Sequence, residues 1–177
     1  MPVTYVKGDP LLTRAQILAF GHNARGRPEQ SPLALALQQR YPAAFASYTR
    51  QCRQGRIQPG MFWRWSEARP TLGFMVVRES PVGATRLRFV DTVVLLLARD
   101  HRREAIGSVA LTPPGSSDEW PQHRELIERW LAASALPVVV YTTYQPGVTA
   151  AEPFDPPTDP SERRRDEDDE GEIGGDL

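Results

Sequence analysis

The chain has 177 residues, with 21 Lys and Arg against 22 Asp and Glu, and therefore a net charge of −1. This length favours one domain plus a tail. The sequence contains no apolar run of membrane-spanning length, no signal-peptide pattern at its N-terminus and a single cysteine, Cys52, which excludes an internal disulfide. These features predict a protein of the reducing cytoplasm.

Two parts of the chain carry opposite charge. Residues 1–151 contain 18 Lys and Arg and 11 Asp and Glu, a net charge of +7, whereas residues 152–177 contain 3 Arg and 11 Asp and Glu, a net charge of −8. A basic body is typical of proteins that bind phosphates or nucleic acid. The Pro-rich acidic stretch has too few apolar groups to repay the entropy of ordering. We therefore expect a domain over 1–146 and a disordered tail over 147–177. The tail either keeps the protein soluble, which we favour, or contacts the basic body as an acidic arm.

The first half of the body predicts strands that alternate with helices. Ser31 is a natural N-cap, Pro32 fits the first turn of a helix, and Leu33, Leu37 and Tyr41 repeat at helical spacing. The expected elements, in chain order, are a strand over 3–7, an apolar turn over 11–16, a strand over 17–20, a polar loop over 21–30, helices over 31–40 and 43–54, and a strand over 61–65 that pairs through a turn at 67–70 with a strand over 71–78.

The second half of the body continues this alternation. A helix over 85–101, an apolar strand over 108–112, a loop over 113–120, a helix over 121–133 and a buried strand over 137–142 follow. Strands that are apolar on both faces need a layer of helices on each side. We therefore predict an α/β fold, in which a three-layer α/β/α sandwich surrounds a mixed sheet.

Three polar segments follow the ends of predicted strands. They are Asp9, the loop over 21–30 and the loop over 113–120. In sheets of this kind ligands bind beyond the carboxyl ends of the strands, so we expect these segments to share one rim. The helix that begins at Ser31 adds unpaired backbone N–H groups, which suit an anion. This rim is the predicted ligand site.

Three parts of the sequence are distinctive. They are VTYVKGD near the start, PLALALQQRYPAAFASYTRQCRQGRIQPGMFWRW in the middle, and SVALTPPG, EWPQHRELIERWL and PVVVYTTY toward the end. These stretches resemble the macrodomain family. The resemblance covers residues 3–144 and points to the branch of DNA ADP-ribosyl glycohydrolase antitoxins and terminal ADP-ribose glycohydrolase. It implies a macrodomain-like fold with a cleft for ADP-ribose at the strand ends.

The resemblance implies roles for a few positions. Asp9 matches the aspartate that accepts from the adenine amino group, but Pro10 lacks the backbone N–H that the family offers beside it. Asn23 matches the asparagine that faces the distal ribose, and Tyr141 matches a tyrosine of the adenine pocket. The family's Gly-rich phosphate loop matches residues 114–117, where the sequence is shorter. The ligand contacts expected from this loop are those of Gly115, Ser116 and Ser117.

The loop that carries the family's catalytic lysine differs most in this sequence. The glycohydrolases of the branch place a lysine near the distal ribose, where attack by the amine gives a covalent sugar intermediate. This sequence has Gln30, Ser31 and Pro32 there, and Lys7, on the first predicted strand, is the one lysine of the chain. Arginine stays protonated and is a poor nucleophile. We therefore expect binding without the lysine mechanism.

Two groups of residues on the rim leave alternatives open. His22 is either a general base or, as we favour, a loop histidine bonded to the backbone. Arg25 and Arg27, together with the helix start at Ser31, either hold a pyrophosphate or lie in solvent.

The second rim loop raises a similar choice between catalysis and structure. Asp118 and Glu119 either supply an acid that activates water or, as we favour, stabilise the start of the next helix through its dipole. His101 and His123 have no metal-ligand spacing with Cys52, so we expect no metal and no cofactor.

The sequence leaves three functional hypotheses. The first is a divergent macrodomain that binds ADP-ribose or a related nucleotide, either free or on ADP-ribosylated nucleic acid or protein. The second is an ADP-ribosyl glycohydrolase that uses water with an acid or a histidine in place of lysine. The third is a degenerate macrodomain that serves as a nucleic-acid or protein interaction module. Because the basic body argues for an anionic partner, we rank a nucleotide ligand first.

Overall fold

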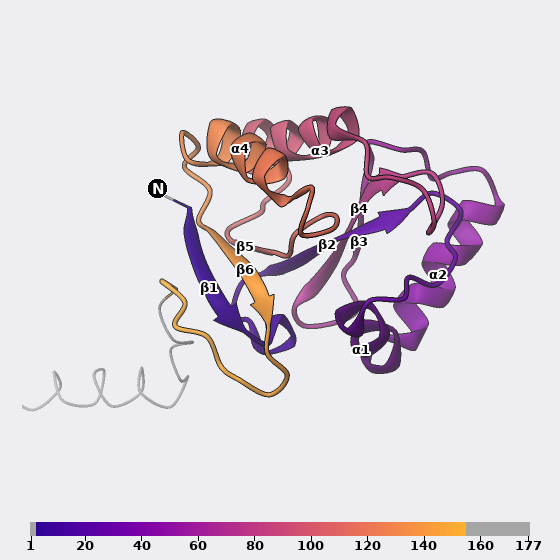
Figure 1. Cartoon of the computed structure of the whole chain (residues 1–177), viewed down its shortest axis with the longest axis horizontal. Helices are drawn as coiled ribbons and strands as arrows, with labels where there is room; N and C mark the ends of the chain where they lie inside the picture. Colours follow the sequence, from indigo (N-terminus) through magenta and orange to yellow (C-terminus); the bar gives the residue numbers. More distant parts are fainter. Residues whose placement is uncertain (1–2, 155–177) are drawn as a thin grey trace, which may run out of the picture.

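The computed structural model describes residues 3–154, which form a six-stranded sheet between two pairs of helices (Figure 1). The elements, in chain order, are β1 (Thr4–Gly8), the short 3-10 helix η1 (Pro10–Leu12), β2 (Ile17–Asn23), α1 (Pro32–Arg40), α2 (Pro42–Arg53), β3 (Phe62–Trp65), β4 (Thr71–Arg78), α3 (Leu87–Asp100), β5 (Val109–Leu111), α4 (Trp120–Leu131) and β6 (Val138–Tyr144). The predicted α/β/α sandwich with a mixed sheet is confirmed.

The sheet brings the ends of five strands to one edge. Its strand order is β1-β6-β5-β2-β4-β3, and every neighbouring pair is parallel except the hairpin of β3 and β4. Parallel strands end on the same side of a sheet. The loops that follow β1, β2, β4, β5 and β6 therefore share one edge.

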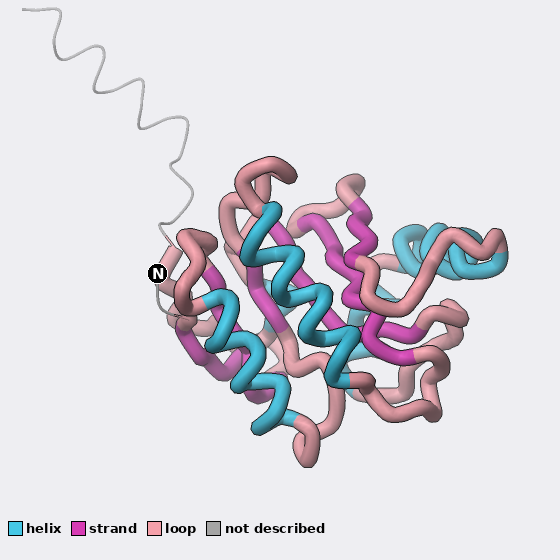
Figure 2. Tube along the Cα trace, turned by 90° about the horizontal axis from the view of Figure 1, so that it is seen from above, coloured by secondary structure: helices cyan, strands magenta, loops and turns pink. Residues whose placement is uncertain are grey.

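The alternation of side chains explains why both faces of the sheet are covered. In β2, Ile17 and Ala19 pack into the cluster that α3 and α4 complete, whereas Leu18 and Phe20 pack into the cluster of α1 and α2. Successive side chains of a strand point to opposite faces, so a strand that is apolar throughout needs helices on both. Figure 2 shows the strands with helices lying along the sheet.

The start of α1 agrees with the sequence prediction. The Ser31 side chain accepts a hydrogen bond from Ala34 N at 3.2 Å, and Pro32 occupies the first turn. The proline has no N–H, which costs nothing at this position, because a helix leaves its first N–H groups unpaired.

Four element boundaries differ from the prediction by two residues or more, and one of them is the end of α4, at Leu131 instead of residue 133. The second strand, expected to end at Phe20, continues to Asn23, because residues 21–23 also pair with β4, although they are a glycine and two polar residues. The third helix begins at Leu87 instead of residue 85, and the last strand reaches Tyr144 instead of residue 142. The first rim loop therefore starts only at Ala24.

Residues 147–154 lie beyond the domain boundary expected at 146 and pack against the body. The Glu152 carboxylate accepts a hydrogen bond from Arg14 N at 2.8 Å and another from the Tyr141 hydroxyl at 3.0 Å. The rest of the expected acidic tail, and any contact it makes with the basic body, falls outside the described residues. Within the described part of the chain, no helix is long and apolar enough to cross a membrane.

Candidate functional site

A cavity of about 470 Å³ opens at the edge where the parallel strands end. Its wall comes from β2, β4 and β6, from the start of α1 and from the segment after β5. Pockets for small ligands have volumes of about 300–1,000 Å³. The rim predicted from the strand ends is therefore a cavity of ligand size.

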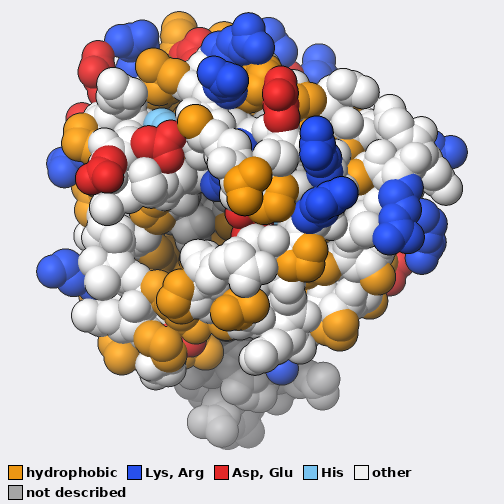
Figure 3. Space-filling view, turned by 45° about the vertical axis from the view of Figure 1, so that its right-hand side comes forward, with side chains coloured by type: hydrophobic (Ala, Val, Ile, Leu, Met, Phe, Trp, Pro, Cys, Tyr) orange, Lys and Arg blue, Asp and Glu red, His pale blue; other side chains and the backbone are white. Residues whose placement is uncertain are grey.

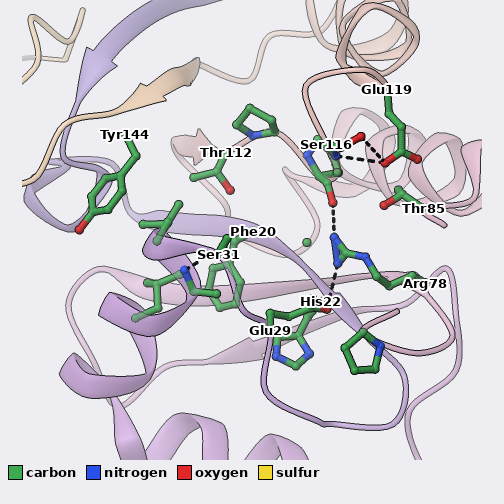
Figure 4. Close-up of a pocket in the computed structure, with 18 of the residues that line it drawn as sticks. Phe20, His22, Glu29, Ser31, Arg78, Thr85, Thr112, Ser116, Glu119 and Tyr144 are labelled. Atoms are coloured by element: carbon green, nitrogen blue, oxygen red, sulfur yellow. Dashed lines mark hydrogen bonds and ion pairs between the residues drawn. The ribbon is translucent and has the colours of Figure 1, made fainter. Parts of the chain in front are cut away.

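The cavity has two chemically different ends (Figure 4). Tyr144 lies at one end, whereas Glu29, Arg78 and Glu119 lie at the other. We call them the aromatic end, which comprises Tyr141 and Tyr144 of β6, and the charged end, which comprises Glu29, Arg78 and Glu119.

Arg78, the last residue of β4, joins the two rim loops. Its Nη1 donates to Glu29 Oε1 at 3.0 Å and its Nη2 donates to the Pro114 carbonyl at 2.6 Å. The Arg78 side chain is 12% exposed and that of Glu29 is 14% exposed. Among the described residues that line the cavity, Arg78 is the one basic side chain. It holds the loop over 24–31 and the loop over 112–119 against the end of β4.

Asn23 holds the first rim loop together and does not line the cavity. It is fully buried, and its side-chain nitrogen donates to Arg27 O at 2.8 Å and to Glu29 Oε1 at 3.0 Å. Its side-chain oxygen accepts from the backbone N–H groups of Arg25 and Arg27. The Tyr48 hydroxyl donates to the Asn23 carbonyl at 2.7 Å. The resemblance implies that the Asn23 amide faces a ribose, but in this structure the amide is hydrogen-bonded to residues of its own loop and stabilises that loop.

The arginines expected to hold a pyrophosphate point elsewhere. Arg25 and Arg27 are exposed and lie outside the cavity wall, whereas Ser31 lines it. The Ser31 hydroxyl caps α1, as described above. The structure thus brings the cap of α1 to the cavity but not the two cations of the loop.

The second rim loop contributes Gly115, Ser116 and Glu119 to the wall, while Ser117 and Asp118 are exposed and lie outside it. Glu119 Oε1 accepts from Ser116 N at 3.1 Å and from Ser116 Oγ at 3.0 Å. Burial alone would raise the pKa of Glu119, but the hydrogen bonds from Ser116 outweigh it, and the pKa lies below its usual value. Glu119 precedes α4 without capping it by its side chain, and it is an ionised carboxylate at the charged end.

Gly115 lies where no side chain fits. A Cβ at this position would come within 2.7 Å of Glu119 Oε1, 2.8 Å of Thr85 Oγ1 and 3.0 Å of His123 Cε1, so these side chains would have to move to admit it. Gly21 is more constrained, since its Cβ would meet the backbone carbonyl oxygen of Pro114 at 2.3 Å. Both glycines let the second rim loop lie close against its neighbours.

His22 lines the cavity but is a poor general base near neutral pH. It is 2% exposed, and its ring packs against Phe45, Tyr48 and Phe74. Burial lowers the pKa of His22 to about 4, against a weaker opposing effect of the hydrogen bond with the Asn23 carbonyl. A general base works best when its pKa lies near the working pH. The ring is therefore a neutral part of the wall.

The aromatic end lies beside the turn that follows β1. Pro10 lines the cavity, and Tyr141 and Tyr144 come from the end of β6. Asp9 is buried outside the wall, where its carboxylate accepts from Leu11 N at 2.9 Å and from Gly147 N at 2.8 Å. The carboxylate thus joins two backbone turns behind this end.

Lys7 does not reach the cavity. It is exposed on β1, the strand at the edge of the sheet, and does not line the wall.

The described residues contain no group of three or more His, Cys, Asp or Glu side chains that would hold a metal ion. Figure 3 shows the surface hollowed, with hydrophobic, acidic and basic side chains around the hollow.

Comparison with known proteins identifies the fold. No family model matches the chain, and no curated protein matches its sequence. The macrodomain of Thermus aquaticus DarG superposes with a TM-score of 0.72 at 22% identity, over 79% of this chain and 97% of that one. The macrodomain of Mycobacterium tuberculosis DarG gives 0.70 at 22% identity, over 78% and 96%.

A third similar structure contains a ligand. Thermosipho africanus DarTG in complex with ADP-ribose superposes with a TM-score of 0.72 at 16% identity, over 82% of this chain and 42% of that one. The similarity in all three cases extends over most of this chain. The chain therefore has the macrodomain fold.

Proposed function

We propose that this chain binds ADP-ribose or a related nucleotide in the cavity at the strand ends, either free or attached to nucleic acid or protein. The observation that carries the proposal is one cavity of about 470 Å³ with aromatic rings at one end and a single arginine at the other. The fold supports it, because one of the similar structures, Thermosipho africanus DarTG, is a complex with ADP-ribose.

In this proposal the base of the nucleotide lies at the aromatic end and its phosphates extend toward Arg78. Aromatic side chains stack on any nucleobase, and a guanidinium pairs with phosphate oxygens in a fork. Lys7 lies away from the cavity, so the lysine-dependent glycohydrolase reaction is not part of the proposed function.

Calorimetry with ADP-ribose tests the proposal. We expect saturable heat for the full chain, and a strong loss of affinity in Leu33→Trp, because Leu33 lines the cavity and the larger ring fills it. Leu35→Trp is the matched control, since Leu35 is exposed on the same helix and outside the wall. Absence of heat at millimolar ADP-ribose, or equal binding by both variants, contradicts the proposal. The remaining hypothesis is then a nucleic-acid or protein interaction module.

A hydrolase is the second candidate, and Glu119 is the observation that favours it. Glu119 lines the cavity as an ionised carboxylate, and its oxygens can accept hydrogen bonds from a water and orient that water for attack; its lowered pKa makes it a positioning group and not a strong base. Incubating the full chain with ADP-ribosylated DNA or protein separates the two functions. Release of ADP-ribose that Glu119→Gln abolishes, while Lys7→Ala leaves it intact, supports a hydrolase. Binding without release supports a reader.

A further inference from the structure

We propose that the Glu29 carboxylate occupies the anion subsite at Arg78, and that a phosphate-bearing ligand must displace it in order to bind. Glu29 would thus be a built-in competitor that lowers the affinity of the cavity for anionic ligands and leaves the affinity for neutral ones unchanged. This inference rests on the proposed nucleotide function, since it concerns the same cavity.

The charge at this end of the cavity is unfavourable for a phosphate as it stands. Arg78 brings one positive charge, whereas Glu29 and Glu119 bring two negative ones, and the buried His22 is neutral. Both outer nitrogens of Arg78 already donate, to Glu29 Oε1 and to the Pro114 carbonyl. The guanidinium is therefore already hydrogen-bonded when a phosphate approaches, and the net negative charge of this end of the cavity repels the phosphate.

Of the two carboxylates, Glu29 is the one that a ligand can displace. Glu119 is held inside its own loop by the backbone and the hydroxyl of Ser116. Among the described residues, the Glu29 carboxylate is held by two side chains, those of Arg78 and Asn23, both through Oε1. Its chain neighbours Pro28 and Gln30 are exposed, so the backbone on either side of this partly buried residue reaches the surface.

The same loop offers a new position for the displaced carboxylate. Arg25 and Arg27 are exposed, and neither forms an ion pair with a described residue. A carboxylate that leaves Arg78 regains water, on a loop whose two exposed arginines lie two and four residues before it in the chain. A ligand phosphate then takes the guanidinium in a charge-assisted, bidentate contact. The exchange keeps every charge paired, but the ligand must first break an existing pair.

The test compares an anionic and a neutral ligand on two single variants, on the double variant that combines them and on a control. Glu29→Gln removes the negative charge and keeps an oxygen for Arg78 and Asn23. We expect it to tighten ADP-ribose binding about fivefold to tenfold, which corresponds to one partly screened charge pair, and to leave adenosine unchanged. Arg78→Met should weaken ADP-ribose, and in that background Glu29→Gln should have no effect. Glu104→Gln, which removes a carboxylate paired with Arg64 outside the cavity, is the matched control and should change nothing.

The outcomes separate this inference from the proposed function. Unchanged or weaker ADP-ribose binding by Glu29→Gln, with adenosine binding intact, overturns the inference alone. If neither nucleoside ligand binds, the proposed function fails, and phosphorus NMR of inorganic pyrophosphate still tests the anion subsite. Broadening that is greater in Glu29→Gln than in the unmodified chain and absent in Arg78→Met supports the inference, whereas equal broadening in all three overturns it. Glu29→Ala serves as the second variant if Glu29→Gln does not fold.

Discussion

The two ends of the cavity are assembled from different parts of the chain. At the aromatic end, Tyr141 and Tyr144 belong to one strand, β6, and their placement follows from its regular geometry. At the charged end, Glu29, Arg78 and Glu119 come from three separate segments, and the ion pair between Glu29 and Arg78 joins residues 49 positions apart. The backbone of one strand sets the positions of the side chains at the aromatic end. The charged end forms only when the two rim loops pack against the end of β4.

This difference has a chemical consequence. The aromatic end offers neutral rings, which hold a base with little dependence on pH or salt. The charged end depends on charges that are partly removed from water, so its properties change with one proton or one carboxylate. Perturbation of the charged end should therefore affect both folding and ligand choice, while perturbation of the aromatic end should affect affinity alone.

The largest expected effect is a loss of stability in acid caused by His22. Its pKa in the folded chain is about 4, below the unperturbed 6.5. Between pH 6.5 and 4, His22 is protonated in the unfolded chain but neutral in the folded chain. The free energy of unfolding therefore decreases as the pH is lowered toward 4. The shift corresponds to about 3 kcal/mol across this window. Urea unfolding at several pH values measures it.

The matched variant for this prediction is His22→Phe, which keeps an aromatic ring among Phe45, Tyr48 and Phe74. It should be markedly less sensitive to pH between 6.5 and 4, with some sensitivity left because burial also lowers the pKa of His123. An identical pH dependence of the variant and the unmodified chain would show that His22 does not resist protonation.

The difference between one continuous strand and three separate segments also explains which features of the fold and the site the sequence predicts. The cap at Ser31, the continuous apolar run at the start of β2 and the order of elements are local signals, and the structure confirms them. Arg78 was missed, because its partners lie 36 and 49 residues away and its one local signal is a charge that ends the buried stretch TLGFMVVR. Asn23 was expected to face a ligand, but no local pattern shows that four hydrogen bonds already engage its amide.

Gly21→Ala tests the junction between the two ends with a smaller expected effect. The added Cβ would lie 2.3 Å from the Pro114 carbonyl oxygen, which also accepts from Arg78. The second rim loop must move away, and we expect a loss of about 2 kcal/mol in the free energy of unfolding, as for other overpacked sites. Denaturant unfolding measures it. Gly107→Ala is the control, because its Cβ would meet only the flexible Gln16 side chain, at 3.3 Å. Equal stability of the two variants would mean that the loop adapts freely.

The smallest expected effect is at the aromatic end itself. Tyr144 lines the cavity at the end of β6 and is partly exposed, so its removal leaves the core intact. Tyr144→Ala should weaken both adenosine and ADP-ribose by about fivefold to tenfold, since stacking contributes about 1–3 kcal/mol per base. Tyr144→Phe keeps the ring and should bind like the unmodified chain. Calorimetry with both ligands gives the answer. A loss confined to ADP-ribose would place the base elsewhere, because a ring that stacks on adenine must affect both ligands equally.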